Sequence, residues 1–202
     1  MFLAFDVVNN GVNSVWGIAG VGKSSVARTV YYNQMLDSAG PKTSLFDSSS
    51  DTLFEAFGWV DVAPSCQFNL TEFAWHLLLD LCSDDPQAKE IAAVSMVEEG
   101  CQVPIRECCK ILQEIRCLVV IDGLHSTQDW DLIKATFLSK PIKSTIVVIT
   151  IEEKVAMHCV ENDKSRVTNI RRLEADVALS LLEKVCYLHT DPFFFPCIVL
   201  RN

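Results

Sequence analysis

The sequence is short of positive charge. It carries 17 lysine and arginine residues against 26 aspartate and glutamate residues, a formal net charge of −9. A protein that holds nucleic acid through its phosphates needs a basic surface, so we expect no nucleic-acid partner. A free nucleotide is compatible with an acidic chain, because its phosphates need only a local group of positive charges and backbone N–H groups.

Long apolar runs are also missing. No run reaches the roughly 18 residues that a membrane span requires, so we expect no membrane span. Residues 1–6 lack a basic segment and a long apolar core, which argues against a signal peptide. Half of the 202 residues are nevertheless hydrophobic, enough for one folded α/β domain with a sizeable core.

Paired cysteine motifs are absent. The chain has nine cysteines, an odd number, and none of them forms a CxxC pair. Several lie in apolar runs, as Cys117 does before residues 118–120, where cysteine behaves as a small buried hydrophobe. We therefore expect reduced thiols in an intracellular, cytoplasmic protein, and neither a disulfide framework nor a zinc site.

Glycine is sparse, yet three of the 8 glycines fall in one stretch that fits the phosphate-loop pattern GxxxxGK[ST]. Such a loop aims backbone N–H groups at a phosphate chain, its lysine neutralises the β- and γ-phosphates, and its hydroxyl residue binds Mg²⁺. The predicted ligands run in sequence, the last being a second hydroxyl residue: Gly17, Ile18, Ala19, Gly20, Val21, Gly22, Lys23, Ser24 and Ser25.

The context of this stretch agrees with the motif. Residues 14–16 form a short apolar run typical of a buried strand, and residues 25–36 have apolar side chains at helical spacing. The positive N-terminal end of that helix would add to the same anion site. Residues 1–13 are predicted to be a lead-in segment, because they contain the turn-forming run Asn9-Asn10-Gly11.

Strands and helices are predicted to alternate along the rest of the chain. Asn69 or Thr71 can cap one helix and Ser126 or Thr127 another, and Pro104 suits a first helical position. The alternation favours an α/β fold, a doubly wound parallel sheet of five strands. The predicted strands are 14–16, 57–62, 117–121, 145–150 and 166–170; the predicted helices are 25–36, 69–83, 88–96, 104–115, 126–137, 152–159 and 174–188.

Two further candidate residues stand at strand ends. Ligands of open α/β sheets collect beyond the carboxyl ends of the strands, where Asp122 and Thr150 are expected. Asp122 follows four apolar residues, as a Walker B aspartate does, and would hold Mg²⁺ together with Ser24. The simpler alternative is an aspartate that starts a turn before Gly123.

Hydrolysis needs a further group that orients or deprotonates the attacking water. Gly123 can do neither, and Asp129 and Asp131 lie too far along the chain to be assigned that role. His125 is a weaker candidate for approaching the phosphates. We therefore predict slow or absent turnover and assign no catalytic residue.

Four stretches in order resemble motifs of one family, the plant NB-ARC domain of nucleotide-binding leucine-rich-repeat disease-resistance proteins. The stretch 15–27 looks like its phosphate loop and 57–62 like its second-strand motif. The stretch 117–124 with Trp130 looks like its "kinase 2" motif, and 144–150 like its next strand motif. The resemblance covers residues 14–188 and leaves 189–202 as an apolar C-terminal tail.

The resemblance implies a STAND/AAA+-like P-loop NTPase sheet, in which strand 145–150 lies between the phosphate-loop strand and the Asp122 strand. It implies a switch that binds ADP or ATP with Mg²⁺, and partners among other immune-receptor domains or a second copy of the chain. The sequence departs from the family pattern at Gly123, where a second aspartate is usual, and at Ile151, where an arginine is usual. The later motifs and the leucine-rich repeats are absent, as in a truncated gene product.

Two other functions stay open at this stage. One is a degenerate fragment that no longer binds nucleotide and acts only through protein interaction. The other is an active P-loop ATPase or kinase, although Arg166, Arg171 and Arg172 lack the spacing of a kinase lid.

Overall fold

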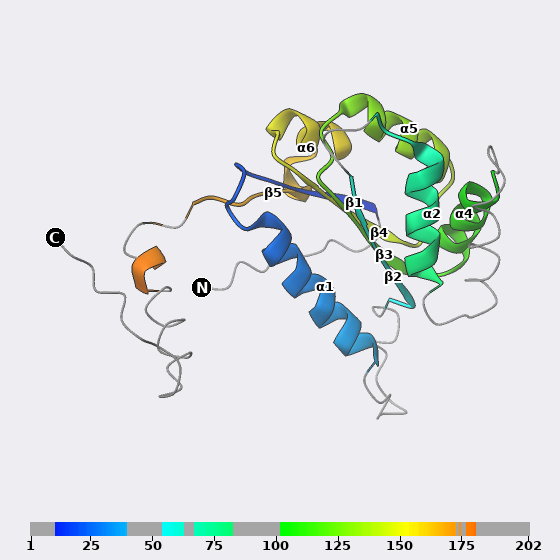
Figure 1. Ribbon diagram of the computed structural model, residues 1–202, viewed down its shortest axis with the longest axis horizontal. Helices are drawn as coiled ribbons and strands as arrows, with labels where there is room; N and C mark the ends of the chain where they lie inside the picture. The colour runs from blue at the N-terminus through cyan, green and yellow to red at the C-terminus, as the bar shows by residue number, and fades with distance from the viewer. Residues whose placement is uncertain are drawn as a thin grey trace, which may run out of the picture. The chain divides into compact units, whose positions relative to one another are not determined.

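The computed structural model describes residues 11–39, 54–62, 67–82, 102–172, 174 and 177–180. The chain divides into two compact units, residues 1–170 and residues 171–202. The sheet and the helices that bear on function lie in the first unit (Figure 1).

The first unit is built on one five-stranded sheet whose order is β2-β3-β4-β1-β5. Each neighbouring pair is parallel, so the predicted doubly wound parallel α/β sheet is confirmed. β4 lies between β1 and β3, as the resemblance implied. The strands are β1 (Gly11–Trp16), β2 (Ala56–Asp61), β3 (Cys117–Asp122), β4 (Thr145–Thr150) and β5 (Val167–Asn169).

The central strands are apolar on both sides. All six residues of β4 and the first five of β3 are buried. A parallel strand covered on both faces needs this kind of continuous apolar run, which is why β3 and β4 could be predicted with the least ambiguity.

The helices begin where the sequence offers a cap. The Asn69 side chain accepts the N–H groups of Thr71 and Glu72, and the Ser126 hydroxyl accepts those of Gln128 and Asp129. Of the paired alternatives, Asn69 and Ser126 are therefore the N-caps. The helices are α1 (Lys23–Ala39), α2 (Leu70–Leu81), α4 (Val103–Glu114), α5 (Thr127–Phe137) and α6 (Glu153–Cys159).

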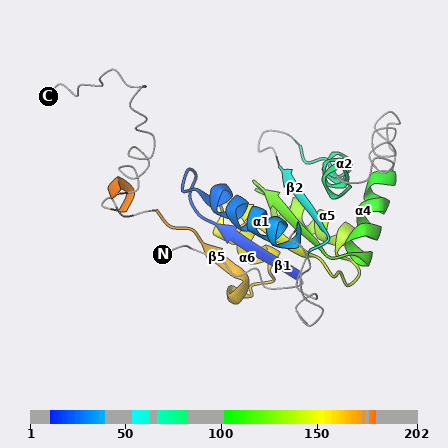
Figure 2. The ribbon, with the colours of Figure 1, turned by 90° about the horizontal axis from the view of Figure 1, so that it is seen from below.

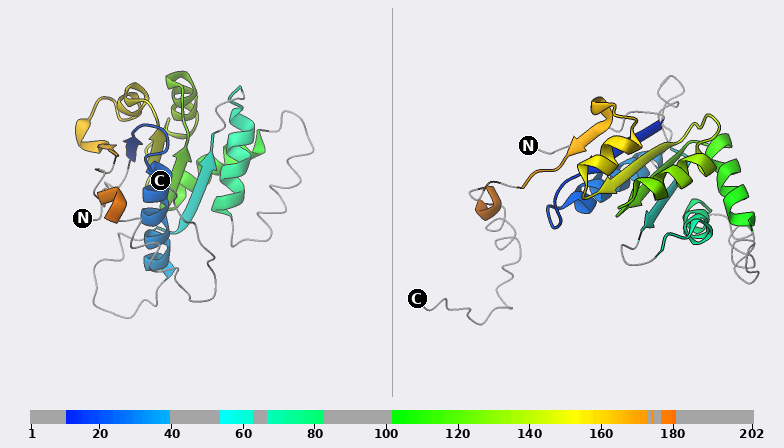
Figure 3. Two further views of the ribbon diagram at one scale, coloured as in Figure 1. Left: turned by 60° about the vertical axis from the view of Figure 1, so that its left-hand side comes forward. Right: turned by 90° about the horizontal axis from the view of Figure 1, so that it is seen from above.

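Helices cover both faces of the sheet. The views from below and from above show α1 on one side of the strands and α5 and α6 on the other (Figures 2 and 3). Two buried clusters fill these layers. The α1 face packs Ala27 and Tyr31 against Val120 and Ile149, whereas the opposite face packs α2, α4, α5 and α6 against the alternate strand residues.

Several strand boundaries differ from the prediction: β2 lies one residue earlier, β3 ends one residue later, and β1 and β5 begin elsewhere. β1 begins at Gly11, earlier than the predicted strand 14–16, because Gly11 and Val12 already pair with Thr145 and Ile146 of β4. β5 begins at Val167, since residues 164–166 form a 3-10 helix whose N-cap is Asp163.

Other predicted segments fall outside the described residues. These are the helix at 88–96, the tail at 189–202 and residues 181–188 of the last predicted helix. Of that last helix, residues 177–180 are described and are helical.

The described cysteines are free thiols, and four of these five are buried. Burial raises the pKa of Cys117 to about 11 and that of Cys159 to about 12, so both are neutral, unreactive core residues near pH 7. None of the helices in the described part of the chain combines the length and the apolar character that crossing a bilayer demands.

Candidate functional site

The glycine loop connects β1 to α1 at the carboxyl end of the sheet. A Cβ atom at position 17 would lie 2.4 Å from the carbonyl oxygen of Ile170, so only glycine lets the chain leave β1 this close to the residue after β5. Gly20 and Gly22 have φ values of +77° and +93°, which side chains rarely tolerate. The tip of the loop is exposed at residues 18–20, which leaves its backbone open to a ligand.

Lys23 lies within this loop. Its side chain is only 8% exposed, and its ammonium donates a hydrogen bond to the carbonyl oxygen of Ile18 at 3.0 Å. Burial lowers the pKa of Lys23, and the negative charge of Asp122 acts in the opposite direction. An ammonium group held inside a loop of backbone amides is suited to a phosphate anion.

Asp122 ends β3 and meets the loop. The Ser24 hydroxyl lies near enough to the Asp122 carboxylate to lower its pKa, so the two predicted Mg²⁺ ligands are neighbours. Burial is the largest cause that raises the pKa of Asp122, and the Ser24 hydroxyl and the charges of Arg28 and Lys23 partly oppose it.

The contacts of the other two predicted ligands are local. Ser25 is exposed, and its carbonyl oxygen accepts a hydrogen bond from the Thr29 hydroxyl at 3.0 Å. Thr150 is 1% exposed and pairs with Trp16 across the sheet. Its hydroxyl accepts the N–H of Glu152 at 3.2 Å, close to the start of α6.

The residues after Asp122 supply no second acid to this group. Gly123 has a φ of +84°, and a Cβ atom there would lie 2.9 Å from the Val62 carbonyl oxygen. His125 is half-buried beyond it. Asp131 lies on α5 and pairs with His158 of α6 at 2.7 Å.

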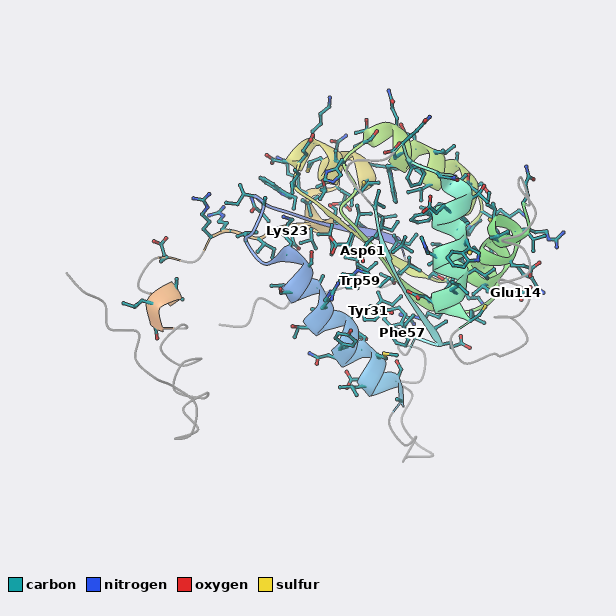
Figure 4. The ribbon with its side chains drawn as sticks, viewed as in Figure 1. Lys23, Tyr31, Phe57, Trp59, Asp61 and Glu114 are labelled. Carbon is teal, nitrogen blue, oxygen red and sulfur yellow. The ribbon has the colours of Figure 1, made fainter. Side chains whose placement is uncertain are left out.

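Three residues near Asp122 were given no role in the sequence analysis: Arg28, Trp59 and Asp61. Figure 4 shows Lys23 at the start of α1, and Asp61, Trp59 and Phe57 following one another along β2. The guanidinium of Arg28 lies over the Trp59 ring at 5.0 Å, and the Trp59 indole donates to Asp61 at 3.1 Å. Two signals could have found them: Arg28 is one helical turn after Ser24, and Asp61 continues the alternation of Phe57 and Trp59.

The donor set suits a nucleotide-bound Mg²⁺ ion. Ser24 and Asp122 offer the oxygen ligands that Mg²⁺ prefers, and Lys23 stands where phosphates would bind. Among the described residues, no three or more His, Cys, Asp or Glu side chains are grouped so that they could hold a metal by themselves. Mg²⁺ sites of this kind use one or two carboxylates and take the remaining ligands from water and the phosphates.

The relatives of this chain include two Arabidopsis thaliana proteins named for disease susceptibility or disease resistance. The chain is 28% identical over 184 residues to the disease susceptibility protein LOV1 of Arabidopsis thaliana, a match that covers 91% of this chain and 17% of that protein. It is 29% identical over 137 residues to the Arabidopsis thaliana disease resistance protein RPP8, covering 66% of this chain and 12% of that protein. The chain thus spans less than a fifth of the length of these two relatives.

A solved structure shares the fold. The ORC2 protein of Aeropyrum pernix, solved as ADPNP-ADP complexes, matches with a TM-score of 0.53 at 12% identity, over 89% of this chain and 46% of that chain. This similarity concerns the fold alone. The family model of the NB-ARC domain matches residues 5–191. The chain belongs to the NB-ARC domain family.

Proposed function

We propose that this chain is the ADP- or ATP-binding switch domain of a plant defense protein and that it binds the nucleotide with Mg²⁺. One observation carries the proposal: the fold brings Ser24 of the glycine loop next to Asp122 of a strand distant in sequence, beside the buried ammonium of Lys23. These are the groups that a Mg²⁺-bound phosphate chain requires.

The proposed division of roles follows the positions of the residues. The backbone of residues 17–25 and the Lys23 ammonium hold the phosphates, while Ser24 and Asp122 hold the metal ion. Bound Mg²⁺ neutralises phosphate charge. Adenine and the defense context come from the family and its relatives, and Thr150 remains a proposed contact at the adjoining strand end.

Turnover is proposed to be slow or absent. Position 123 carries no acid, and Asp131 is engaged with His158 on the α5–α6 side. Binding energy is therefore available for choosing between two conformations, since a ligand shifts such an equilibrium through its different affinity for the two states.

The test is thermal unfolding with and without Mg-ADP, comparing the unmodified chain with Lys23→Ala. At about 100 times its Kd, a ligand stabilises the folded state by roughly 2.7 kcal/mol, which corresponds to about 5–10 °C for a domain of this size. We expect this shift in the unmodified chain and not in Lys23→Ala. The matched control is Lys154→Ala, which removes an exposed lysine on α6 and should keep the full shift.

The same experiment addresses the alternatives. Lys23 bonds the carbonyl of Ile18 in its own loop, a contact that would suit a loop closed to ligands. An unmodified chain that unfolds at one temperature with and without Mg-ADP would favour the protein-interaction fragment. A shift accompanied by steady phosphate release would instead favour an active ATPase.

A further inference from the structure

Two carboxylates end neighbouring strands of the sheet. β2 and β3 pair in parallel with Asp61 aligned to Asp122, each the last residue of its strand. Asp61 lies two and four residues after Trp59 and Phe57 along β2, and Asp122 lies two and four residues after Val120 and Leu118 along β3. Because side chains alternate along a strand, both acids lie on the face that α1 covers, together with the loop lysine.

Asp61 is held in place by its surroundings. Its carboxylate accepts the Trp59 indole N–H at 3.1 Å, and the Trp59 ring is packed between the guanidinium of Arg28 at 5.0 Å and the edge of Tyr31 at 5.5 Å. The backbone N–H of Trp59 donates to Asp80 at 2.9 Å. The end of β2 is therefore fixed relative to α1, the helix that carries Ser24.

The carboxylate of Asp61 is open to solvent, and Asp61 lies beside Asp122 in the register of β2 and β3. Asp61 is exposed and lines a cavity of about 130 Å³ beside the start of α2. Two like charges at one sheet edge are stabilised by a cation between or beside them.

The local backbone conformation disfavours an acidic side chain at position 123. A side chain there would combine a φ of +84° with a contact of 2.9 Å to the Val62 carbonyl. The neighbouring strand provides an acid at the same edge instead.

We propose that Asp61 is the second carboxylate of the Mg²⁺–nucleotide site and acts beside Asp122. The inference rests on the proposed function and specifies its metal dependence. Without Mg²⁺, Asp61 and Asp122 both repel the phosphates; with Mg²⁺, both attract the ion. Removing the charge of Asp61 therefore changes the affinity for nucleotide in opposite directions in the two conditions.

The experiment is calorimetric titration of ADP with excess Mg²⁺ and with EDTA, for the unmodified chain and Asp61→Asn. Asparagine keeps an oxygen that accepts the Trp59 indole N–H, so this variant removes the charge and retains the packing. We expect metal-free ADP to bind about three- to tenfold more tightly and the enhancement by Mg²⁺ to fall by about tenfold or more, as one nearby, solvent-screened charge allows.

The matched control is Asp37→Asn. It removes an equal charge from an exposed position about 20 Å along α1 from Lys23, at 1.5 Å of rise per residue. Its affinities should equal those of the unmodified chain in both conditions, which separates the local effect of Asp61 from that of net charge.

The outcomes distinguish the two proposals. If the unmodified chain binds ADP and Asp61→Asn keeps the full Mg²⁺ enhancement, the role of Asp61 is refuted and the nucleotide-binding function stands. An equal loss of affinity in both conditions indicates a structural role and refutes it as well. If the unmodified chain takes up no ADP in either condition, the proposed function itself fails.

Discussion

The two faces of the sheet end differently at its carboxyl edge. Under α2, α4, α5 and α6 lies the larger apolar cluster, and its largest enclosed side chains include Trp130 and Phe137. Under α1 the apolar cluster is smaller and gives way to charged side chains, among them Arg28, Asp61 and Asp122. One face consists of packing alone, and the other combines packing with the proposed nucleotide site.

Strand alternation produces this division. In β3, Val119 and Ile121 face the larger cluster, whereas Leu118 and Val120 face the smaller one and lead to Asp122. Substitutions on the first face should therefore change stability alone. Those at the edge of the second face should change ligand affinity, metal dependence or pH dependence.

The largest expected effect comes from Phe137→Ala on the face opposite α1. Phe137 is 2% exposed, and its ring centroid lies 5.9 Å from that of Phe73. Truncation leaves a cavity, so we expect the free energy of unfolding to fall by about 3–5 kcal/mol in urea titrations. Leu132→Ala on the same helix removes a side chain that is 46% exposed and should cost under about 1 kcal/mol.

This variant also tests the separation of the faces. Under conditions in which Phe137→Ala stays folded, its Kd for Mg-ADP should equal that of the unmodified chain. A large change in Kd would show that the apolar face is coupled to the binding edge and would refute the division.

A smaller effect is expected from Gly123→Ala at the boundary between strand and loop. The substitution combines a positive φ with a Cβ that would lie 2.9 Å from the Val62 carbonyl oxygen. We expect the free energy of unfolding without ligand to fall by about 2–3 kcal/mol, since backbone strain alone costs about 1–3 kcal/mol.

Gly20→Ala is the matched control. Gly20 also has a positive φ, +77°, but a Cβ there would meet nothing within 4 Å. The free energy of unfolding of Gly20→Ala should therefore fall only by the cost of the positive φ, about 1 kcal/mol. Equal losses in the two variants would mean that the approach of Val62 does not constrain position 123.

Much of this fold could be predicted from residues that act locally. The caps Asn69 and Ser126, the glycine loop and the apolar runs of β3 and β4 each depend on neighbours in sequence. The proximity of Ser24 to Asp122 could also be predicted, because the phosphate-loop and Walker B motifs are expected to meet at one Mg²⁺ site.

The residue register between strands and the contacts between a helix and a strand could not be predicted. Nothing in one sequence says that Asp61 aligns with Asp122 or that Arg28 reaches Trp59, because both depend on strand register and helix placement. The start of β1 at Gly11 was missed for the same reason: its first residues are extended because β4 lies beside them.

The smallest expected effect is a difference in pH dependence between Asp122 and Asp163. The pKa of Asp122 is raised above 3.8, chiefly by burial, whereas that of Asp163 is lowered below 3.8, chiefly by the Ser165 hydroxyl at 2.7 Å. Asp122 belongs to the proposed nucleotide site, and Asp163 caps the 3-10 helix before β5. The fold therefore disfavours the charged form of Asp122 and favours the charged form of Asp163.

The signs follow from proton linkage. Between 3.8 and its raised pKa, folded Asp122 binds more protons than the unfolded chain does, so its contribution to stability falls as pH rises through that window. Asp163 contributes stability above 3.8 and loses it as pH falls through its lowered pKa. Without nucleotide at pH 7, Asp122→Asn should therefore melt above the unmodified chain and Asp163→Asn below it. Melting curves from pH 3 to 8 should show both differences shrinking toward the acid end. Melting-temperature shifts of the same sign for the two variants at pH 7 would contradict this, because they would mean that the fold affects the charged forms of Asp122 and Asp163 in the same direction.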